Sequence, residues 1–138
     1  MKVIIRKSTL FITALLLIMS FLSTSVFASL PEDNGIYKKK INGSTWYFTV
    51  NDYTDRTSST KYLGEVHIYK GKKNFDNNKM CFNGQYYKSG NHKYTVKTGS
   101  VKITFTVKSN YIQVKQSKGK IKGTKMSGKF TLVRHRYA

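Results

Sequence analysis

Residues 99–108 read GSVKITFTVK, and apolar and polar side chains alternate through this stretch without a break. In an extended chain Val101, Ile103, Phe105 and Val107 point to one face, and the lysines and threonines between them point to the other. A period of two residues predicts a β-strand and not a helix. One dry face and one wet face are typical of an antiparallel sheet that covers a single core.

The same alternation recurs along most of the chain. Trp46, Phe48 and Val50 share one face of an early run, and Phe130 alternates with polar neighbours in a late one. Turn-forming pairs separate the runs, among them Asn42-Gly43, Gly71-Lys72, Asn83-Gly84, Thr98-Gly99 and Ser109-Asn110. We expect strands near residues 35–40, 44–51, 61–70, 79–88, 92–98, 100–108, 110–116, 119–123 and 127–134. This pattern predicts an all-β fold, either a single compact antiparallel barrel or a sandwich, and only a barrel leaves no open edge.

The first 28 residues have the three-part pattern of a secretory signal peptide. Lys2, Arg6 and Lys7 precede an uncharged apolar run at 9–22, which is shorter than the roughly 20 residues that span a bilayer. Val26-Phe27-Ala28 forms the cleavage site, so we expect cleavage after Ala28 and a secreted protein. Residues 29–138 are then a single β domain with no transmembrane span.

Charge is distributed unevenly along this domain. The whole chain has 25 Lys and Arg residues against 6 Asp and Glu residues, a net charge of +19. Residues 29–76 contain all 6 acids, whereas residues 77–138 contain 14 basic residues and no acid. Repulsion within such a segment opposes folding, so the segment invites an anionic partner. The alternative is a basic surface that only improves solubility.

Lysine dominates the basic residues and is placed on predicted strand faces. An ammonium group is a mobile point charge, whereas the planar guanidinium of arginine reads phosphates and bases. We therefore expect contact with diffuse anionic polymers or surfaces and no sequence-specific recognition of nucleic acid. Wall polymers, glycans and anionic lipid headgroups belong to this class, and the last implies peripheral membrane contact. The lysines expected to bind are Lys93, Lys97, Lys102, Lys108, Lys115, Lys118, Lys120, Lys122 and Lys125.

No recognisable motif for catalysis, a cofactor or a metal is present in the sequence. The three histidines, His67, His92 and His135, are far apart, and Glu65 shares a strand face with His67 but has no third ligand beside it. Cys81 is the only cysteine, so an internal disulfide is excluded. We expect a buried, inert thiol there, with a reactive thiol as the alternative. The chain is therefore expected to bind without catalysing, and to need no cofactor or metal.

Two stretches resemble a known family. Residues 43–47 (GSTWY) are similar to the Gly-x-Trp opening of calycins, the lipocalin-like and avidin-like barrels, with one more residue between Gly and Trp. Residues 126–134 (MSGKFTLVR) resemble the last strand of small bacterial barrels of that style. The resemblance implies an antiparallel barrel with a ligand mouth, and a late basic residue, Arg134 or Arg136, that packs over Trp46.

A ligand pocket follows as an alternative function. The chain has 10 tyrosines, more than a core of this size needs, and some of them are candidates to line a cleft for a sugar or an apolar ligand. The expected pocket residues are Trp46, Tyr47, Tyr69, Tyr94 and Arg134. The alternative to polyanion binding is thus a small-ligand carrier or inhibitor, and the second alternative is a cationic antimicrobial protein.

Overall fold

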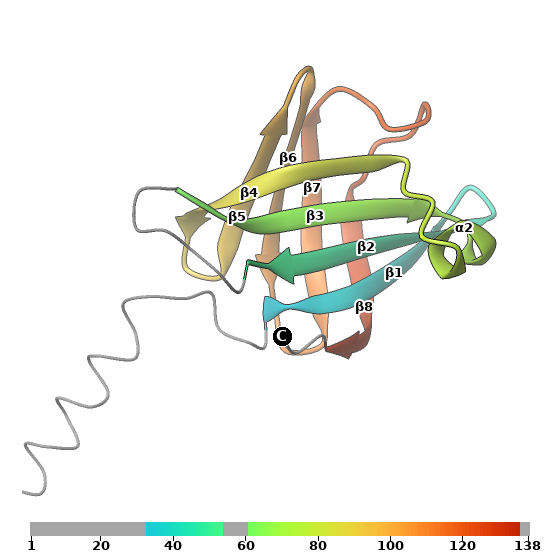
Figure 1. Cartoon of the computed structure of the whole chain (residues 1–138), viewed down its shortest axis with the longest axis horizontal. Coiled ribbons are helices and arrows are strands. Elements are labelled where there is room, and N and C mark those ends of the chain that lie inside the picture. The colour runs from blue at the N-terminus through green and yellow to red at the C-terminus, as the bar shows by residue number, and fades with distance from the viewer. Residues whose placement is uncertain (1–32, 54–60, 136–138) are drawn as a thin grey trace, which may run out of the picture.

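A computed structural model describes residues 33–53 and 61–135, which form a closed barrel of eight antiparallel strands in chain order (Figure 1). The strands are β1 (Gly35–Ile41), β2 (Ser44–Asp52), β3 (Tyr62–Lys70), β4 (Phe82–Gly90), β5 (Lys93–Thr98), β6 (Val101–Val107), β7 (Tyr111–Lys118) and β8 (Gly128–His135). The predicted all-β fold is confirmed, and the barrel is the observed one of the two expected architectures. It is compatible with the calycin-like fold that the resemblance implies. The predicted signal peptide lies outside the described residues.

The barrel closes because β1 pairs on both sides. Gly35 lies opposite Val50 of β2 and also opposite His135 of β8. Closure gives each described strand a partner on both sides, which protects a chain so rich in strand-forming residues from pairing with other chains.

Each observed strand coincides with a predicted one to within three residues, but the strand predicted at 119–123 is wrong. Ile121 and Thr124 form only an isolated bridge, whose two backbone hydrogen bonds are 2.8 and 2.9 Å long. Lys122 (φ 50) and Gly123 (φ 72) between them adopt left-handed backbone, which closes a tight turn. Ile121 is buried although it lies in a turn, so the sequence around it has the alternating apolar pattern of a strand.

The turn predicted at Asn83-Gly84 is also wrong, because both residues lie within β4. Gly84 is buried, and a β-carbon there would come within 2.6 Å of Val96 Cγ1 and 2.7 Å of Thr98 Oγ1. This glycine therefore serves the close packing between β4 and β5, not a turn.

The barrel interior is filled by the alternate residues of the strands. Trp46, Phe48, Phe105 and Phe130 are fully or almost fully buried there. The ring of Phe48 lies 5.3 Å from that of Phe105 and 5.7 Å from that of Phe130, measured between centroids. Tyr37, Tyr86 and Tyr94 add three more buried rings. The inward faces predicted from the period of two are confirmed.

A short helix, α2 (Lys72–Asp76), follows β3 and was not predicted. Phe75 stacks on Tyr47 with centroids 4.3 Å apart and lies edge-on to Tyr69 at 5.3 Å. These rings and Ile36 form a second apolar cluster, separate from the interior. Among the described residues, no helix has the length and apolar content needed to cross a membrane.

The two ends of the barrel are built differently. The α2 end carries the β1–β2 and β5–β6 turns, helix α2 and the β7–β8 connection, residues 119–127. The terminal end carries the β4–β5 and β6–β7 turns, together with the start of β1 and the end of β8. Ile121 and Met126 of the β7–β8 connection belong to the core cluster and so help to close the α2 end.

Candidate functional site

Three lysines lie in one row across neighbouring strands near the α2 end. Lys97 of β5 is directly opposite Lys102 of β6, and Lys102 is directly opposite Lys118 of β7. A register shift between Lys102 and Ile103 brings Lys118 into this row. Lys115, which precedes Lys118 in β7, lies opposite Thr104 of β6. Lys97, Lys115 and Lys118 are exposed, and Lys102 is half-buried.

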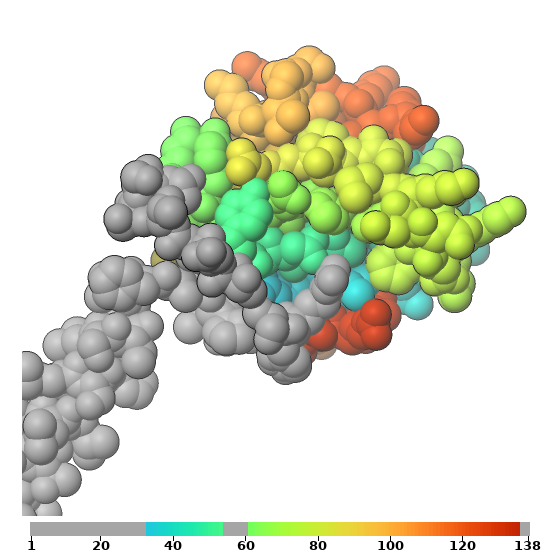
Figure 2. Space-filling model, viewed as in Figure 1, coloured from blue at the N-terminus to red at the C-terminus, as the bar shows by residue number. Residues whose placement is uncertain are grey.

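The β7–β8 connection extends this row of cations. Lys120, Lys122 and Lys125 are exposed, whereas Ile121 and Met126 between and beside them are buried. In Figure 2 the β5–β6 turn (orange) adjoins this connection (red-orange) at one edge of the molecule. We call the combined region the lysine surface; its residues are Lys97, Lys102, Lys115, Lys118, Lys120, Lys122 and Lys125.

The other two predicted polymer-binding lysines lie elsewhere. Lys93 is opposite Thr106, towards the terminal end, and Lys108 follows directly after β6 at that end. The structure therefore groups seven of the nine predicted lysines and separates Lys93 and Lys108 from them.

Within the described residues, no lysine of the lysine surface forms an ion pair. By contrast, Lys72 in α2 donates to Asp76 Oδ2 at 2.7 Å. Among the described residues the lysine surface thus concentrates positive charge without an ion-paired carboxylate, and residues 77–138, which supply all of its lysines, contain no acid.

The five predicted pocket residues lie in three different places of the described barrel. Trp46 and Tyr94 are buried in the core cluster, whereas Tyr47 and Tyr69 belong to the second cluster with Phe75. Arg134 is exposed on β8 opposite Ile36, at the terminal end.

The cation beside Trp46 is Lys70, whose Nζ lies 5.6 Å from the ring centroid. Trp46 pairs with Lys39 and Lys70 near the α2 end, far along the strands from Arg134. The packing of Arg134 over Trp46 that the resemblance implies is therefore not observed, and Arg136 lies outside the described residues.

A pocket of about 410 Å³ opens at the terminal end, and we call it the terminal pocket. Four segments that are distant in sequence meet there: the residues before β1, the β4–β5 turn, the end of β6 with the turn after it, and the end of β8. The lining residues are Asp33, His92, Val107, Lys108, Ser109 and His135.

A buried carboxylate forms the floor of this region. Asp33 is only 2% exposed, and its oxygens lie 3.0 and 3.2 Å from His92 Nδ1. Tyr94 also donates its hydroxyl to Asp33 Oδ2. An ionised carboxylate only accepts hydrogen bonds, so His92 Nδ1 is the donor. Burial, and then the Asp33 carboxylate, raise the pKa of Tyr94 far above its ordinary value, so this phenol stays protonated.

Sequence reasoning missed this arrangement. Asp33 lies before the first predicted strand, and His92 lies 59 positions away in a hairpin turn. The left-handed backbone of His92 (φ 52), which non-glycine residues seldom adopt, becomes visible only in the structure.

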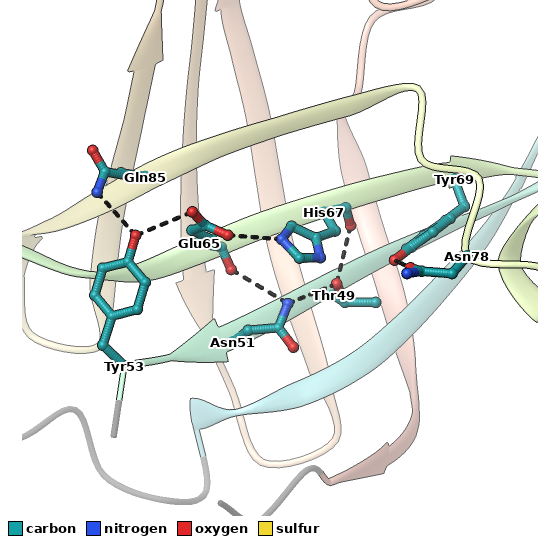
Figure 3. Close-up of polar contacts among 8 residues, drawn as sticks. All are labelled: Thr49, Asn51, Tyr53, Glu65, His67, Tyr69, Asn78 and Gln85. Atoms are coloured by element: carbon teal, nitrogen blue, oxygen red, sulfur yellow. Dashed lines mark hydrogen bonds and ion pairs between the residues drawn. The ribbon is translucent and has the colours of Figure 1, made fainter. Parts of the chain in front are cut away.

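A network of polar side chains covers the outer face of β2, β3 and β4 (Figure 3). Glu65 Oε1 accepts from the Tyr53 hydroxyl at 3.2 Å, and Glu65 Oε2 lies 3.0 Å from His67 Nε2. Gln85 Nε2 donates to the Tyr53 hydroxyl at 2.9 Å. Glu65 and His67 thus share a face as predicted. No group of three or more metal-ligating side chains occurs in the described part of the chain.

Cys81 lies just before β4 and packs against the core cluster. Its Sγ donates to the carbonyl oxygen of Ile68 at 3.4 Å. Burial raises the pKa of this thiol, which disfavours the thiolate, the reactive form. Cys81 is half-buried and not buried as expected, and its raised pKa favours the inert thiol over the reactive one.

Comparison of the chain with protein-family models, with curated proteins and with solved structures gives no match. Function must therefore be inferred from the residues themselves.

Proposed function

We propose that this chain is a secreted, non-enzymatic protein that binds anionic polymers or surfaces through the lysine surface. The observation that carries this proposal is the row of Lys97, Lys102 and Lys118 in direct register on three strands. Like charges directly opposite each other on a sheet are destabilising. A chain that keeps three of them in one row gives up folding stability for a concentrated positive charge.

The geometry favours an extended ligand. The row crosses three strands that lie about 4.8 Å apart, so its ammonium groups repeat at a spacing of the same order as charges along a polymer. Two of its three side chains are exposed, and the lysines of the β7–β8 connection continue the row. An anion on the surface lowers the repulsion among all of them at once.

The chemistry favours a diffuse contact. Lysine binds as a point charge and does not offer the planar fork that reads a particular phosphate or base. Wall polymers, glycans and anionic lipid headgroups present repeated charges of this kind. The proposal therefore predicts binding that depends on charge density and salt, with little dependence on sequence or sugar identity.

The test compares two triple variants of equal charge. Lys97→Gln/Lys102→Gln/Lys118→Gln removes the row, and Lys38→Gln/Lys40→Gln/Lys73→Gln removes three exposed lysines elsewhere. Binding to long-chain polyphosphate is measured against salt. For a flexible polymer each lost contact lowers the slope of log K against log salt by about 0.7, so the first variant should lose about 2 units.

The control variant should retain most of the slope, because β1 pairs with β2 and β8 and α2 packs on β2 and β3, whereas the row lies on β5–β7. Equal losses in the two variants would show that only net charge matters, and the lysine surface would then be a solubilising feature. Circular dichroism of both variants confirms that the fold survives.

The closed eight-stranded barrel favours a second candidate, a calycin-like carrier of a small ligand. The interior around Trp46 is occupied by aromatic rings, so this function requires a ligand that displaces or bypasses them. Quenching or a shift of the Trp46 fluorescence by apolar ligands or oligosaccharides would support it. Unchanged emission across such ligands would leave polyanion binding as the function.

A third candidate, a cationic antimicrobial protein, needs an exposed apolar patch beside the cations. Among the described residues, the exposed large apolar side chains are Met80 and Val133, which lie on different segments. This arrangement gives the antimicrobial function no support, and leakage from anionic vesicles tests it directly.

A further inference from the structure

We propose that the terminal pocket is a second binding site, which takes a small oxyanion with a carboxylate or phosphate head. It is separate from the lysine surface, which lies towards the α2 end. Its size, about 410 Å³, falls within the range of roughly 300–1,000 Å³ of small-molecule sites.

The lining supplies donors and positive charge from three segments. Lys108 and Ser109 come from the turn after β6 and are exposed, so an ammonium and a hydroxyl are available at the rim. His92 comes from the β4–β5 turn, and His135 from the end of β8. Imidazole, ammonium and hydroxyl groups are the side chains that bind oxyanions by charge-assisted hydrogen bonds.

Asp33 is the carboxylate that lines the pocket, and its repulsion of a bound anion is reduced by its burial and its hydrogen bonds. Both oxygens of Asp33 accept hydrogen bonds, from His92 Nδ1 and from the Tyr94 hydroxyl. The negative charge is thus buried and compensated by two donors. His92 lines the pocket, and with Nδ1 donating to Asp33 its other ring nitrogen, Nε2, donates to an oxyanion when the ring carries its second proton.

The site is also held in place before any ligand binds. Asp33 fixes the orientation of the His92 ring, and the Val107 amide donates to the carbonyl oxygen of His92 at 2.8 Å. That bond ties the β4–β5 turn to the end of β6, next to Lys108. A preorganised site loses little entropy on binding, which favours a specific ligand.

The experiment follows the imidazole proton signals of the three histidines by NMR at about pH 6, near the ordinary pKa of histidine. The probes are inorganic phosphate and acetate, with chloride at equal ionic strength as the reference. Phosphate or acetate should shift the His92 and His135 signals in a saturable way. His67, on the outer face of β3, is an internal control and should not move.

Two single variants with the same charge change locate the site. Lys108→Gln should weaken binding of the probe about tenfold, since a charge-assisted hydrogen bond is lost. Lys120→Gln, on the lysine surface, should leave the affinity within about twofold of the original. His92→Asn should also weaken binding while tolerating the left-handed backbone at this position.

Three results would overturn the inference: shifts that grow without saturation, shifts of His67 equal to those of His92, or equal effects of Lys108→Gln and Lys120→Gln. The two probes distinguish a phosphate from a carboxylate head. The triple variant that removes Lys97, Lys102 and Lys118 separates the two proposals. It should lose polyphosphate and keep the small anion, so either site can fail without the other.

Discussion

The two ends of the barrel show two ways of handling charge. At the α2 end, lysines face each other across strands without a carboxylate between them, and apolar side chains beneath them close the barrel. At the terminal end, one buried carboxylate is compensated by a histidine and a tyrosine beside an open pocket. The first arrangement suits a ligand with many dispersed charges, and the second suits a ligand with one concentrated charge.

The two ends also differ in the interactions that stabilise them. Apolar burial closes the α2 end and is insensitive to pH, whereas the terminal end contains two buried phenols, Tyr37 and Tyr94, whose pKa is raised mainly by burial. Three substitutions test this division.

The largest effect is expected at the apolar closure of the α2 end. Met126 is fully buried in the core cluster, so Met126→Ala should lower the free energy of unfolding by about 3 kcal/mol through lost burial and a new cavity. Met80, which is 37% exposed, provides the control, and Met80→Ala should change stability by less than about 0.5 kcal/mol. Urea denaturation measures both, and similar losses in the two variants would contradict apolar closure by Met126.

An intermediate effect is expected from alkaline pH at the terminal end. Burial, and then Asp33, raise the pKa of Tyr37 well above 10.0, and its hydroxyl has no hydrogen-bond partner within the described residues. The folded state therefore keeps a proton that the unfolded state releases. Stability should be intact below about pH 10 and fall above it by about 1.4 kcal/mol per pH unit for each such phenol.

Tyr37→Phe isolates this contribution. At neutral pH it should change stability little or raise it slightly, since no hydrogen bond is lost. Above about pH 10 the free energy of unfolding should fall less steeply with pH, by the roughly 1.4 kcal/mol per pH unit that one proton contributes. An unchanged slope in urea denaturation at several pH values would show that Tyr37 ionises alike in both states.

The smallest effect is expected in the row of lysines. Lys102 lies between Lys97 and Lys118, so Lys102→Glu turns two repulsions into two attractions and should stabilise the fold by about 0.5–1 kcal/mol at low salt. The gain should shrink in high salt. Lys40→Glu, on β1, should give less, and polyphosphate binding should fall only with Lys102→Glu. No gain in stability would mean that the ammonium groups of Lys97, Lys102 and Lys118 already lie too far apart to repel one another.

Local patterns predicted the fold well. The alternation around Ile103 and Phe105 predicted a strand with one buried face, and the predicted turn at Thr98-Gly99 lies where β5 ends and β6 begins. Local patterns failed where an apolar residue serves a turn, as Ile121 does, or where a glycine serves packing, as Gly84 does. A period of two cannot distinguish these cases, because it records burial and not backbone conformation.

The sites were predicted less completely, since their assembly depends on contacts between distant residues. The register shift that places Lys118 opposite Lys102 has no signature in sequence. The terminal pocket requires barrel closure to bring Asp33 to His92 and β1 to β8. The sequence therefore predicted which lysines are candidates for binding, but it could not predict that they lie at two different ends of the barrel.

The pairing of β1 with β8 has a consequence for how the chain acquires its structure. These two strands come from opposite ends of the described chain, and loops that must close over such a separation form slowly. The barrel is complete only when β8 has paired with β1, so a chain that lacks its last strand keeps two strand edges open. Slow folding is thus a property of this topology.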